Sequence, residues 1–182
     1  MFNCFTKQVI SSVVSTEYPS YTAAGCVFVD GGTVLAGVQK QRLVVQGRAE
    51  PVLSGFGGTR ESTDFDWIHT AIRETVEELF EVKVVPIALV QHLRLALPFK
   101  HVTETNGYVM IQYTFDDLTA LMRLCGSLRS PLYKVQPKTL LDLITKRDWR
   151  TIDCEIGALA LQPLVDGLTI DRLFEEDFGR IQ

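Results

Sequence analysis

Three glutamates, Glu74, Glu77 and Glu78, lie close together in a stretch whose apolar residues recur every three or four positions. This spacing predicts a helix on which the three carboxylates share an arc of roughly 100°, with Ile72 and Val76 on another face. Like charges so placed destabilise a helix by about a few tenths of a kcal/mol per pair. A hard divalent cation would reverse that sign, because Mg²⁺ takes oxygen ligands. Two interpretations are open, a solvated acidic face and a metal site.

The residues before these glutamates favour the metal site. Gly57-Gly58 is followed by a short acidic loop to Asp64, and after eight intervening residues Arg73 directly precedes Glu74. This arrangement resembles the Nudix box, whose pattern is Gly, five residues, Glu, seven residues, then Arg-Glu-apolar-any-Glu-Glu-any-Gly-apolar. The core Arg-Glu-any-any-Glu-Glu is intact here, and Gly58 stands at the position of the box glycine.

The stretch departs from that box at four points. Asp64 replaces the first Glu, one extra residue precedes Arg73, Thr75 stands at an apolar position, and Phe80-Glu81 replaces the closing Gly-apolar pair. Glycine normally supplies a left-handed stop at the end of such a helix, which Phe80 does not do cheaply. We therefore expect the helix to run on or to end differently. None of the four changes removes a candidate metal ligand.

The resemblance implies a hydrolase that requires Mg²⁺ or Mn²⁺ and cleaves a pyrophosphate bond in a nucleoside diphosphate linked to another group. Its metal ligands would be Glu74, Glu77 and Glu78, with the main-chain carbonyl of Gly57, or of Gly58, as a further oxygen. Glu74 or Glu77 would instead serve as the general base. Arg73 would orient a glutamate through a bidentate salt bridge. A surface partner of Glu77 is the alternative role for Arg73.

Two further acidic residues lie in the loop before the expected helix. Asp64 could cap that helix or contact the metal through water, and we favour the cap because Asp is a good N-cap residue. Glu61 could lean on the metal cluster or remain a solvated loop charge.

For the substrate, the same resemblance points to Phe56 and Tyr108, whose rings could stack on a nucleobase, and to Gly58 beside the metal ligands. His101 lies in an expected loop from which it could reach a phosphate. A place in the core for either aromatic ring, and a plain surface loop for His101, are the alternatives.

Length and composition indicate an ordinary globular protein. The chain has 182 residues, of which 46% are hydrophobic and 22% charged, and it has no apolar run long enough to span a membrane. We expect one domain over residues 1–182, with a lead-in at 1–22 and a helix or tail at 168–182. The four cysteines are scattered without a CxxC pair, which favours free thiols and an intracellular place, cytoplasmic or nuclear.

The net charge of −4 argues against a broad nucleic-acid-binding surface, although it leaves room for a small basic patch. We therefore expect activity to depend on the terminal nucleotide and its phosphates, and only weakly on RNA length. The densest positive stretch contains Lys134, Lys138, Lys146, Arg147 and Arg150.

Hydrophobic patterns give a coarse order of elements. Strands are expected at 23–29 and 33–38, joined by a turn at Asp30-Gly31-Gly32, and at 107–115. Residues 82–97 look extended, and loops are expected at 47–51 and 98–106. Helices are expected after the glycine loop and at 118–124, 138–145 and 153–165. This order indicates an α/β or α+β protein, and the resemblance implies the Nudix fold, a mixed sheet sandwiched between helices.

A closer resemblance, over roughly residues 55–165, is to the Nudix branch that contains inosine diphosphatases and RNA-decapping enzymes. It rests on the extra residue before Arg73 and on short motifs at His101-Val102, 109–115, Asp117-Leu118-Thr119, Pro131-Leu132-Tyr133 and, in an expected C-terminal helix, Ile156-Gly157. It implies a nucleotide or a capped RNA end as the partner, no membrane, and leaves a homodimer open. The alternative is an inactive module that binds nucleotide, RNA or a protein. We favour the enzyme, because all three glutamates are kept.

Overall fold

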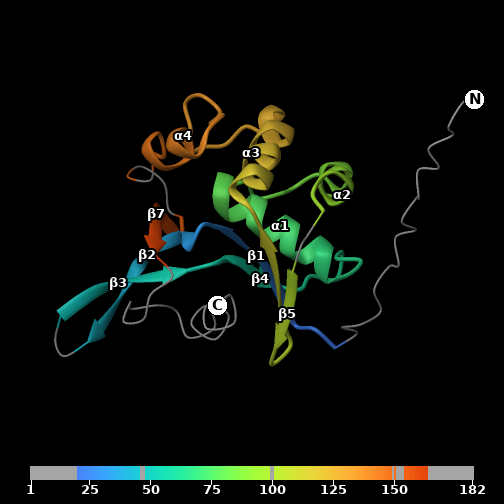
Figure 1. The fold of residues 1–182 in the computed structure, drawn as a ribbon, viewed down its shortest axis with the longest axis horizontal. Coiled ribbons are helices and arrows are strands. Elements are labelled where there is room, and N and C mark those ends of the chain that lie inside the picture. The colour runs from blue at the N-terminus through green and yellow to red at the C-terminus, as the bar shows by residue number, and fades with distance from the viewer. Residues whose placement is uncertain (1–19, 46–47, 99–100, 149, 151–153, 164–182) are drawn as a thin grey trace, which may run out of the picture.

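The computed structural model describes residues 20–45, 48–98, 101–148, 150 and 154–163, so most of the lead-in at 1–22 and all of the tail at 168–182 lie outside the described residues. Figure 1 shows the elements. They are β1 Ala23–Asp30, β2 Thr33–Val45, β3 Arg48–Ser54, β4 Phe56–Thr59, α1 Trp67–Phe80, α2 Ile87–Ala96, β5 His101–Thr105, β6 Tyr108–Tyr113, α3 Phe115–Leu124, α4 Leu140–Thr145 and β7 Ile156–Pro163, with a short 3-10 turn at Cys125–Ser127.

The strands form one mixed seven-stranded sheet with the order β3-β2-β1-β6-β5, in which β4 also pairs with β1 and β7 with β2. The central strand β1 runs parallel to β6 along one edge. Along its other edge, the first half of β1 pairs with β4 and its end pairs with β2, both antiparallel. The mixed sheet and its packing against helices confirm the predicted α+β class.

The turn between β1 and β2 is the one that the sequence predicts. Asp30 pairs with Thr33 across a two-residue loop, and Gly31 and Gly32 have φ angles of 53° and 80°. Positive φ at both loop positions matches the twist of the flanking strands, and glycine adopts it without strain.

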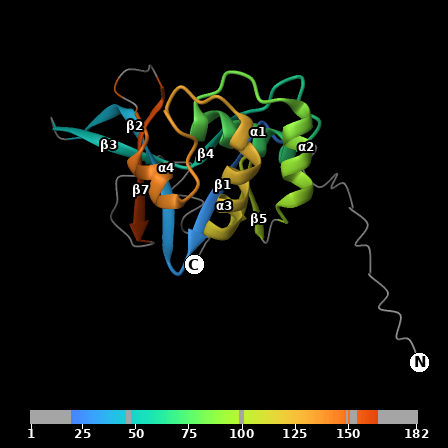
Figure 2. The same ribbon diagram turned by 90° about the horizontal axis from the view of Figure 1, so that it is seen from above.

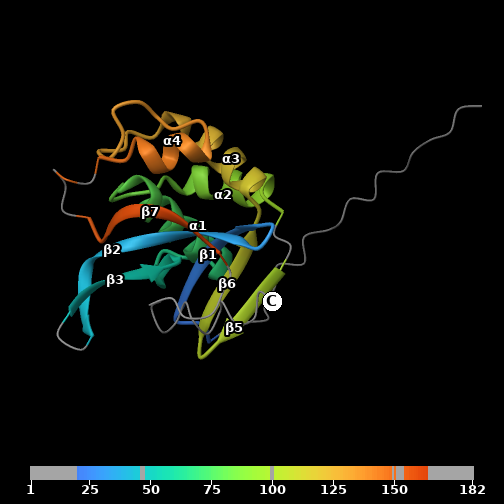
Figure 3. The ribbon, with the colours of Figure 1, turned by 60° about the vertical axis from the view of Figure 1, so that its left-hand side comes forward.

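The main core lies between the sheet and the helices. Alternate residues of β1, among them Cys26 and Phe28, face α1, whose Ile72, Val76 and Leu79 are buried against them. Figures 2 and 3 show the helices gathered over one face of the sheet, with α2 beside α1 and α4 over β7. The other face of the sheet carries a smaller buried cluster of Val27, Val29, Val34, Ala36, Leu53 and Met110.

Two of the larger predictions are wrong in type. Residues 82–97 look extended in sequence, but α2 occupies Ile87–Ala96, because Pro86 starts the helix and Val90 and Leu93 bury one helical face. Residues 153–165 look helical, but Ile156–Pro163 is strand β7, which pairs with β2 along its length. In both stretches tertiary pairing or packing outweighs the local pattern.

Two expected loops contain strands. The loop at 98–106 includes the edge strand β5, which pairs with β6, and the loop at 47–51 includes the start of β3, which pairs with β2. Polar composition is common on such outer strands, since only one edge is paired.

The described residues contain no helix that is both long and apolar enough to cross a bilayer. Cys26, Cys125 and Cys154 are buried free thiols, as expected, and Cys4 lies outside the described residues.

Candidate functional site

The glycine pair lies where the sheet comes closest to α1. Gly57 and Gly58 are on β4, opposite Gly25 and Ala24 of β1. A Cβ atom on Gly58 would lie 2.5 Å from Oε2 of Glu74, so only glycine leaves room for that carboxylate. On the opposite face, a Cβ atom on Gly57 would collide with the hydroxyl of Tyr108. The glycines thus allow the glutamates of α1 to pack directly on the sheet.

Arg73 contacts more of the acidic residues of the site than any other side chain among the described residues, and it is only 6% exposed. Its Nε and Nη2 donate to the two carboxylate oxygens of Asp64, each at 2.9 Å, which is a bidentate pair. The same guanidinium lies 2.9 Å from Oε1 of Glu74, donates to Oε2 of Glu77 at 2.9 Å and reaches the carbonyl of Thr59 at 3.1 Å. The predicted bidentate pair therefore exists, but its partner is Asp64, and the glutamates are held by single contacts.

We expected Asp64 to cap the helix, but it does not. It is 5% exposed and, besides binding Arg73, accepts from the main-chain N–H of Glu61 at 2.9 Å and from the hydroxyl of Thr70 at 2.8 Å. Burial alone would raise the pKa of Asp64, but these donors together bring it below 3.8. The N-cap is Asp66, whose carboxylate accepts from the N–H of His69 at 2.9 Å and pairs with Arg94 at 2.6 Å. Asp64 instead stabilises the buried charge of Arg73.

His69 has a structural role at the start of α1. Its Nδ1 accepts from the N–H of Phe65 at 3.1 Å, and the two rings stack with centroids 5.0 Å apart. Burial lowers the pKa of His69, so the ring is neutral near pH 7.

The three glutamates of α1 lie in surroundings that disfavour their charge. Burial raises the pKa of Glu77 to about 7, against the opposing effect of Arg73. Burial likewise raises the pKa of Glu74, and it raises the pKa of Glu78 well above 4.5 even though Oε2 of Glu78 accepts from the N–H of Gly57 at 2.7 Å. Like charges that are crowded and desolvated in this way are stabilised by a cation.

These side chains open into one cleft of about 530 Å³, which we call the acidic cleft. Glu61, Glu81 and Glu155 join the three glutamates of α1 there. Glu155 was not anticipated, because it comes from the segment before β7 and no spacing links it to the motif. The lining is Gly57, Gly58, Thr59, Arg60, Glu61, Glu74, Glu77, Glu78, Glu81, Val82, Lys83 and Glu155.

Within the part of the chain that the structure describes, no three His, Cys, Asp or Glu side chains converge as a ready-made metal centre. The contacts give the reason. Arg73 draws on Glu74 and Glu77, while the N–H of Gly57 engages Glu78. The carboxylates share a cleft, but Glu74 and Glu77 are bound to Arg73 and Glu78 to the N–H of Gly57.

Only one of the four predicted substrate-binding residues lines the acidic cleft, namely Gly58. Phe56 is fully buried and packs against Phe28, so the prediction that it stacks on a base is wrong. Tyr108 lies on the face of the sheet opposite α1, with its hydroxyl over Gly57. His101 is exposed on the edge strand β5, opposite Gln112.

The C-terminal end of α1 explains the departure at Phe80-Glu81. Phe80 is fully buried, and the left-handed residue is Glu81, with φ 51° and ψ 46°. Arg147, which is 7% exposed, donates to the carbonyl of Leu79 at 2.7 Å and to that of Glu78 at 3.0 Å. Carbonyls that a terminal glycine motif normally satisfies are thus bound by an arginine from a distant segment.

No protein-family model matches the sequence, and the comparison with curated proteins found no match. Solved structures of Nudix hydrolases are similar to the chain in fold. A MutT Nudix hydrolase from Burkholderia pseudomallei has a TM-score of 0.40 and 10% identity, over 88% of this chain and 96% of that one. A Nudix-family hydrolase from Clostridium perfringens has a TM-score of 0.35 and 11% identity, over 89% and 98%.

A third similar structure is the bifunctional NMN adenylyltransferase/ADP-ribose pyrophosphatase from Francisella tularensis, complexed with AMP and a manganese ion. It has a TM-score of 0.36 and 13% identity, over 85% of this chain and 36% of that longer one. Because the three TM-scores are at most 0.40, we base the function on the residues of the acidic cleft.

Proposed function

We propose that the protein is a Nudix-type pyrophosphohydrolase, which cleaves a pyrophosphate bond in a nucleoside diphosphate linked to another group with Mg²⁺ or Mn²⁺. One observation carries this proposal. Glu74, Glu77 and Glu78 open from one face of α1 into a single cleft beside Gly57 and Gly58. A merely solvated acidic face would not be desolvated or packed against the sheet in this way.

The donor set fits a hard divalent cation, because six glutamate side chains line the cleft and oxygen is the ligand that Mg²⁺ and Mn²⁺ prefer. Glu74, Glu77 and Glu78 would hold it. The N–H and C=O of a strand residue point to the same side, and the N–H of Gly57 points at Glu78. The carbonyl of Gly57 therefore faces the same way and would add an oxygen. When bound, the cation neutralises pyrophosphate charge and polarises the attacking water.

The residues of the chain have distinct roles in this reaction. Water attacks phosphorus, the bond from phosphorus to the bridging oxygen breaks, and Glu74 or Glu77 takes the proton of the water. Arg73 contacts both glutamates and holds them in place, while Asp64 fixes the guanidinium of Arg73 through a bidentate ion pair. Asp64 thus acts by positioning, not by touching the substrate.

For the substrate we propose a nucleotide or a capped RNA end, as in the inosine diphosphatase and decapping branch, with an intracellular place, cytoplasmic or nuclear. The extra residue between Asp64 and Arg73 supports this branch, because that spacing is one of the features on which the resemblance rests. The Ile156-Gly157 motif gives no such support, because it lies on β7 and not on a helix.

A binding module without activity is the second candidate function. The ion pairs of Arg73 with Glu74 and Glu77 favour it, because those carboxylates must rearrange before they bind a cation together.

A panel of purine nucleotides, dinucleotides and capped RNA, incubated with Mg²⁺ or Mn²⁺ and read out by product analysis, separates the two functions. We expect hydrolysis that Glu77→Gln or Glu78→Gln reduces by at least about a hundredfold, or ~2.7 kcal/mol. Glu104→Gln, which lies outside the acidic cleft on β5, is the matched control. Full activity in both cleft variants, with normal circular dichroism, would disprove the site.

A further inference from the structure

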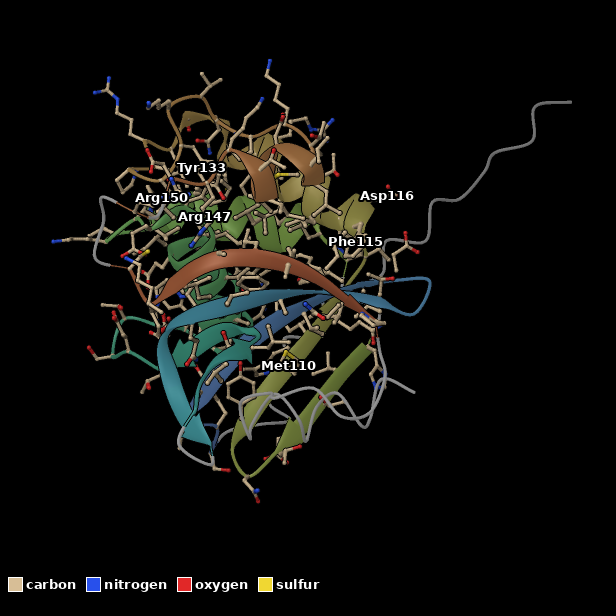
Figure 4. The ribbon with its side chains drawn as sticks, turned by 90° about the vertical axis from the view of Figure 1, so that its left-hand side faces the viewer. Met110, Phe115, Asp116, Tyr133, Arg147 and Arg150 are labelled. Carbon is tan, nitrogen blue, oxygen red and sulfur yellow. The ribbon has the colours of Figure 1, made fainter. Side chains whose placement is uncertain are left out.

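A second charged pocket lies beside the acidic cleft and has the opposite sign. Four cationic side chains, Lys134, Lys146, Arg147 and Arg150, surround a cavity of about 640 Å³, against one carboxylate, Asp148. Figure 4 shows Arg147 and Arg150 near each other on the side of the molecule that carries α4 and β7. We call this the basic pocket. Its lining is Lys134, Val135, Ile144, Thr145, Lys146, Arg147, Asp148, Arg150 and Ala158.

The cations of the basic pocket come from the densest positive stretch of the sequence, but one cation of that stretch lies elsewhere. Lys138 belongs to the same stretch and lies instead in a pocket beside α3. Lys146 is partly neutralised, since its Nζ is 2.6 Å from Oδ1 of Asp142. Among the described residues, no ion pair joins Lys134, Arg147 or Arg150 to a carboxylate. The basic pocket therefore carries excess positive charge in a protein whose net charge is −4.

Arg147 differs from the exposed lysines of this pocket because it is buried. Its side chain is 93% buried, and its donors reach only neutral acceptors, the carbonyls of Glu78, Leu79 and Ile156 and the hydroxyl of Tyr133. Its buried Nε–H finds no acceptor among the described residues. A buried cation whose hydrogen bonds all go to neutral acceptors is costly, and an anion close by would offset that cost beyond the attraction of the Glu78 carboxylate.

The two pockets adjoin through Arg147. Its Nη2 donates to the carbonyl of Glu78, whose side chain lines the acidic cleft, and to that of Ile156, which follows Glu155 of the same cleft. The last turn of α1 and the start of β7 thus separate a site suited to a cation from a site suited to an anion. A ligand would contact both sites if its phosphates extended past this turn of α1 and the start of β7.

We propose that the basic pocket binds a phosphoryl group of the substrate that lies beyond the two phosphates flanking the cleaved bond. This inference rests on the proposed function. Lysine and arginine are the usual phosphate ligands, and an anchor of this kind favours substrates that carry a further phosphate over those that end at the pyrophosphate. A free phosphate-bearing effector would use the same chemistry, and the experiment separates the two sources.

The first arm measures binding without hydrolysis. Inorganic tripolyphosphate is titrated calorimetrically into metal-free protein carrying Glu77→Gln, with and without a second change. We expect Lys134→Glu and Arg150→Glu, both exposed positions, to weaken binding about tenfold each, or ~1.4 kcal/mol, and more strongly at low salt. Lys138→Glu removes the same charge one pocket away and should change the affinity far less. Equal losses in all three variants, or no binding to the parent protein, would overturn the proposal.

The second arm assigns the phosphate to the substrate. The values of kcat/KM are compared for two substrates that differ only in one phosphate beyond the pyrophosphate, using protein with wild-type Glu77. We expect Lys134→Glu and Arg150→Glu to lower kcat/KM about tenfold for the longer substrate only. Unchanged kcat/KM on both substrates, together with the calorimetric losses, would identify an effector site, and equal losses on both would show a general effect of the charge reversal; either result overturns the assignment. Absence of any hydrolysis would disprove the proposed function, while the calorimetric arm would still decide whether the pocket binds phosphate.

Discussion

At its first turn, α1 is held by residues close to it in the sequence, whereas at its last turn it is held by an arginine 68 residues further along. The first turn has the cap Asp66 and the pair of Asp64 with Arg73, all within ten positions of one another. The last turn has Glu81 in the left-handed region and Arg147 on its carbonyls.

The two ends also differ in their charge balance. Arg73 is surrounded by carboxylates, and its partner Asp64 has a lowered pKa, whereas Arg147 meets main-chain carbonyls and a hydroxyl. Removing Arg73 would leave a buried charge without its partner, but removing Arg147 would leave only neutral acceptors. The glutamates are therefore positioned from one end by ion pairs and from the other by hydrogen bonds.

The largest effect is expected at the first turn, from Arg73→Ala. The change leaves Asp64 buried and uncompensated, so we expect a loss of about 3–5 kcal/mol in the free energy of unfolding. Urea titration followed by circular dichroism measures it. The variant Asp64→Asn with Arg73→Ala removes both charges and should recover part of the loss. If the double variant is less stable than Arg73→Ala, the pair is not what holds this turn.

A smaller loss is expected at the last turn, from Arg147→Ala. The carbonyls of Leu79 and Glu78 lose their donor, which we expect to destabilise the fold by about 2–3 kcal/mol. Arg147→Lys keeps the charge but reaches fewer carbonyls, so its stability should lie between those of the wild type and Arg147→Ala. A loss larger than that of Arg73→Ala in the same titration would reverse our ranking of the two ends.

The difference between the ends also explains what the sequence could predict. The spacing of Arg73, Glu74, Glu77 and Glu78 within one helix is local, and the helix and the shared face follow from it. The role of Asp64 was misjudged, because a cap and an ion-pair partner look alike when the start of the helix is known only to within a few residues.

Features that depend on distant segments could not be predicted. Arg147 reaches the last turn of α1 from 68 residues beyond Leu79. Glu155 lines the acidic cleft directly before β7, whose pairing with β2 was missed because its sequence was misread as a helix. Without that pairing, nothing in the pattern links Phe80-Glu81 to Arg147. The sequence therefore predicted only that the helix runs on or ends differently, and the structure shows the second outcome, with Glu81 in the left-handed region.

Acid should weaken the first turn selectively. Because the pKa of Asp64 is lower in the folded protein than in the unfolded chain, its contribution is present above the unfolded pKa near 3.8 and disappears as pH falls through the folded pKa. We expect the stability difference between wild type and Asp64→Asn to shrink as pH falls from 6 to 3, as measured by urea titration. The difference between wild type and Arg147→Ala should change less. A constant difference for Asp64→Asn would argue against an ionised, paired Asp64.

The smallest effect, and the only expected gain, is at Glu81. Its φ of 51° and ψ of 46° strain a residue with a Cβ atom, so Glu81→Gly should stabilise the fold by about 0.5–1 kcal/mol. Glu81→Gln keeps the strain and removes the charge that Glu81 brings to the acidic cleft. Asn106→Gly tests the second non-glycine residue with positive φ among the described residues, where Asn tolerates that conformation better. Thermal melting should rank Glu81→Gly above both controls. If Glu81→Gln stabilises the fold as much as Glu81→Gly does, then repulsion among the glutamates, and not backbone strain, lowers the stability at this end of α1.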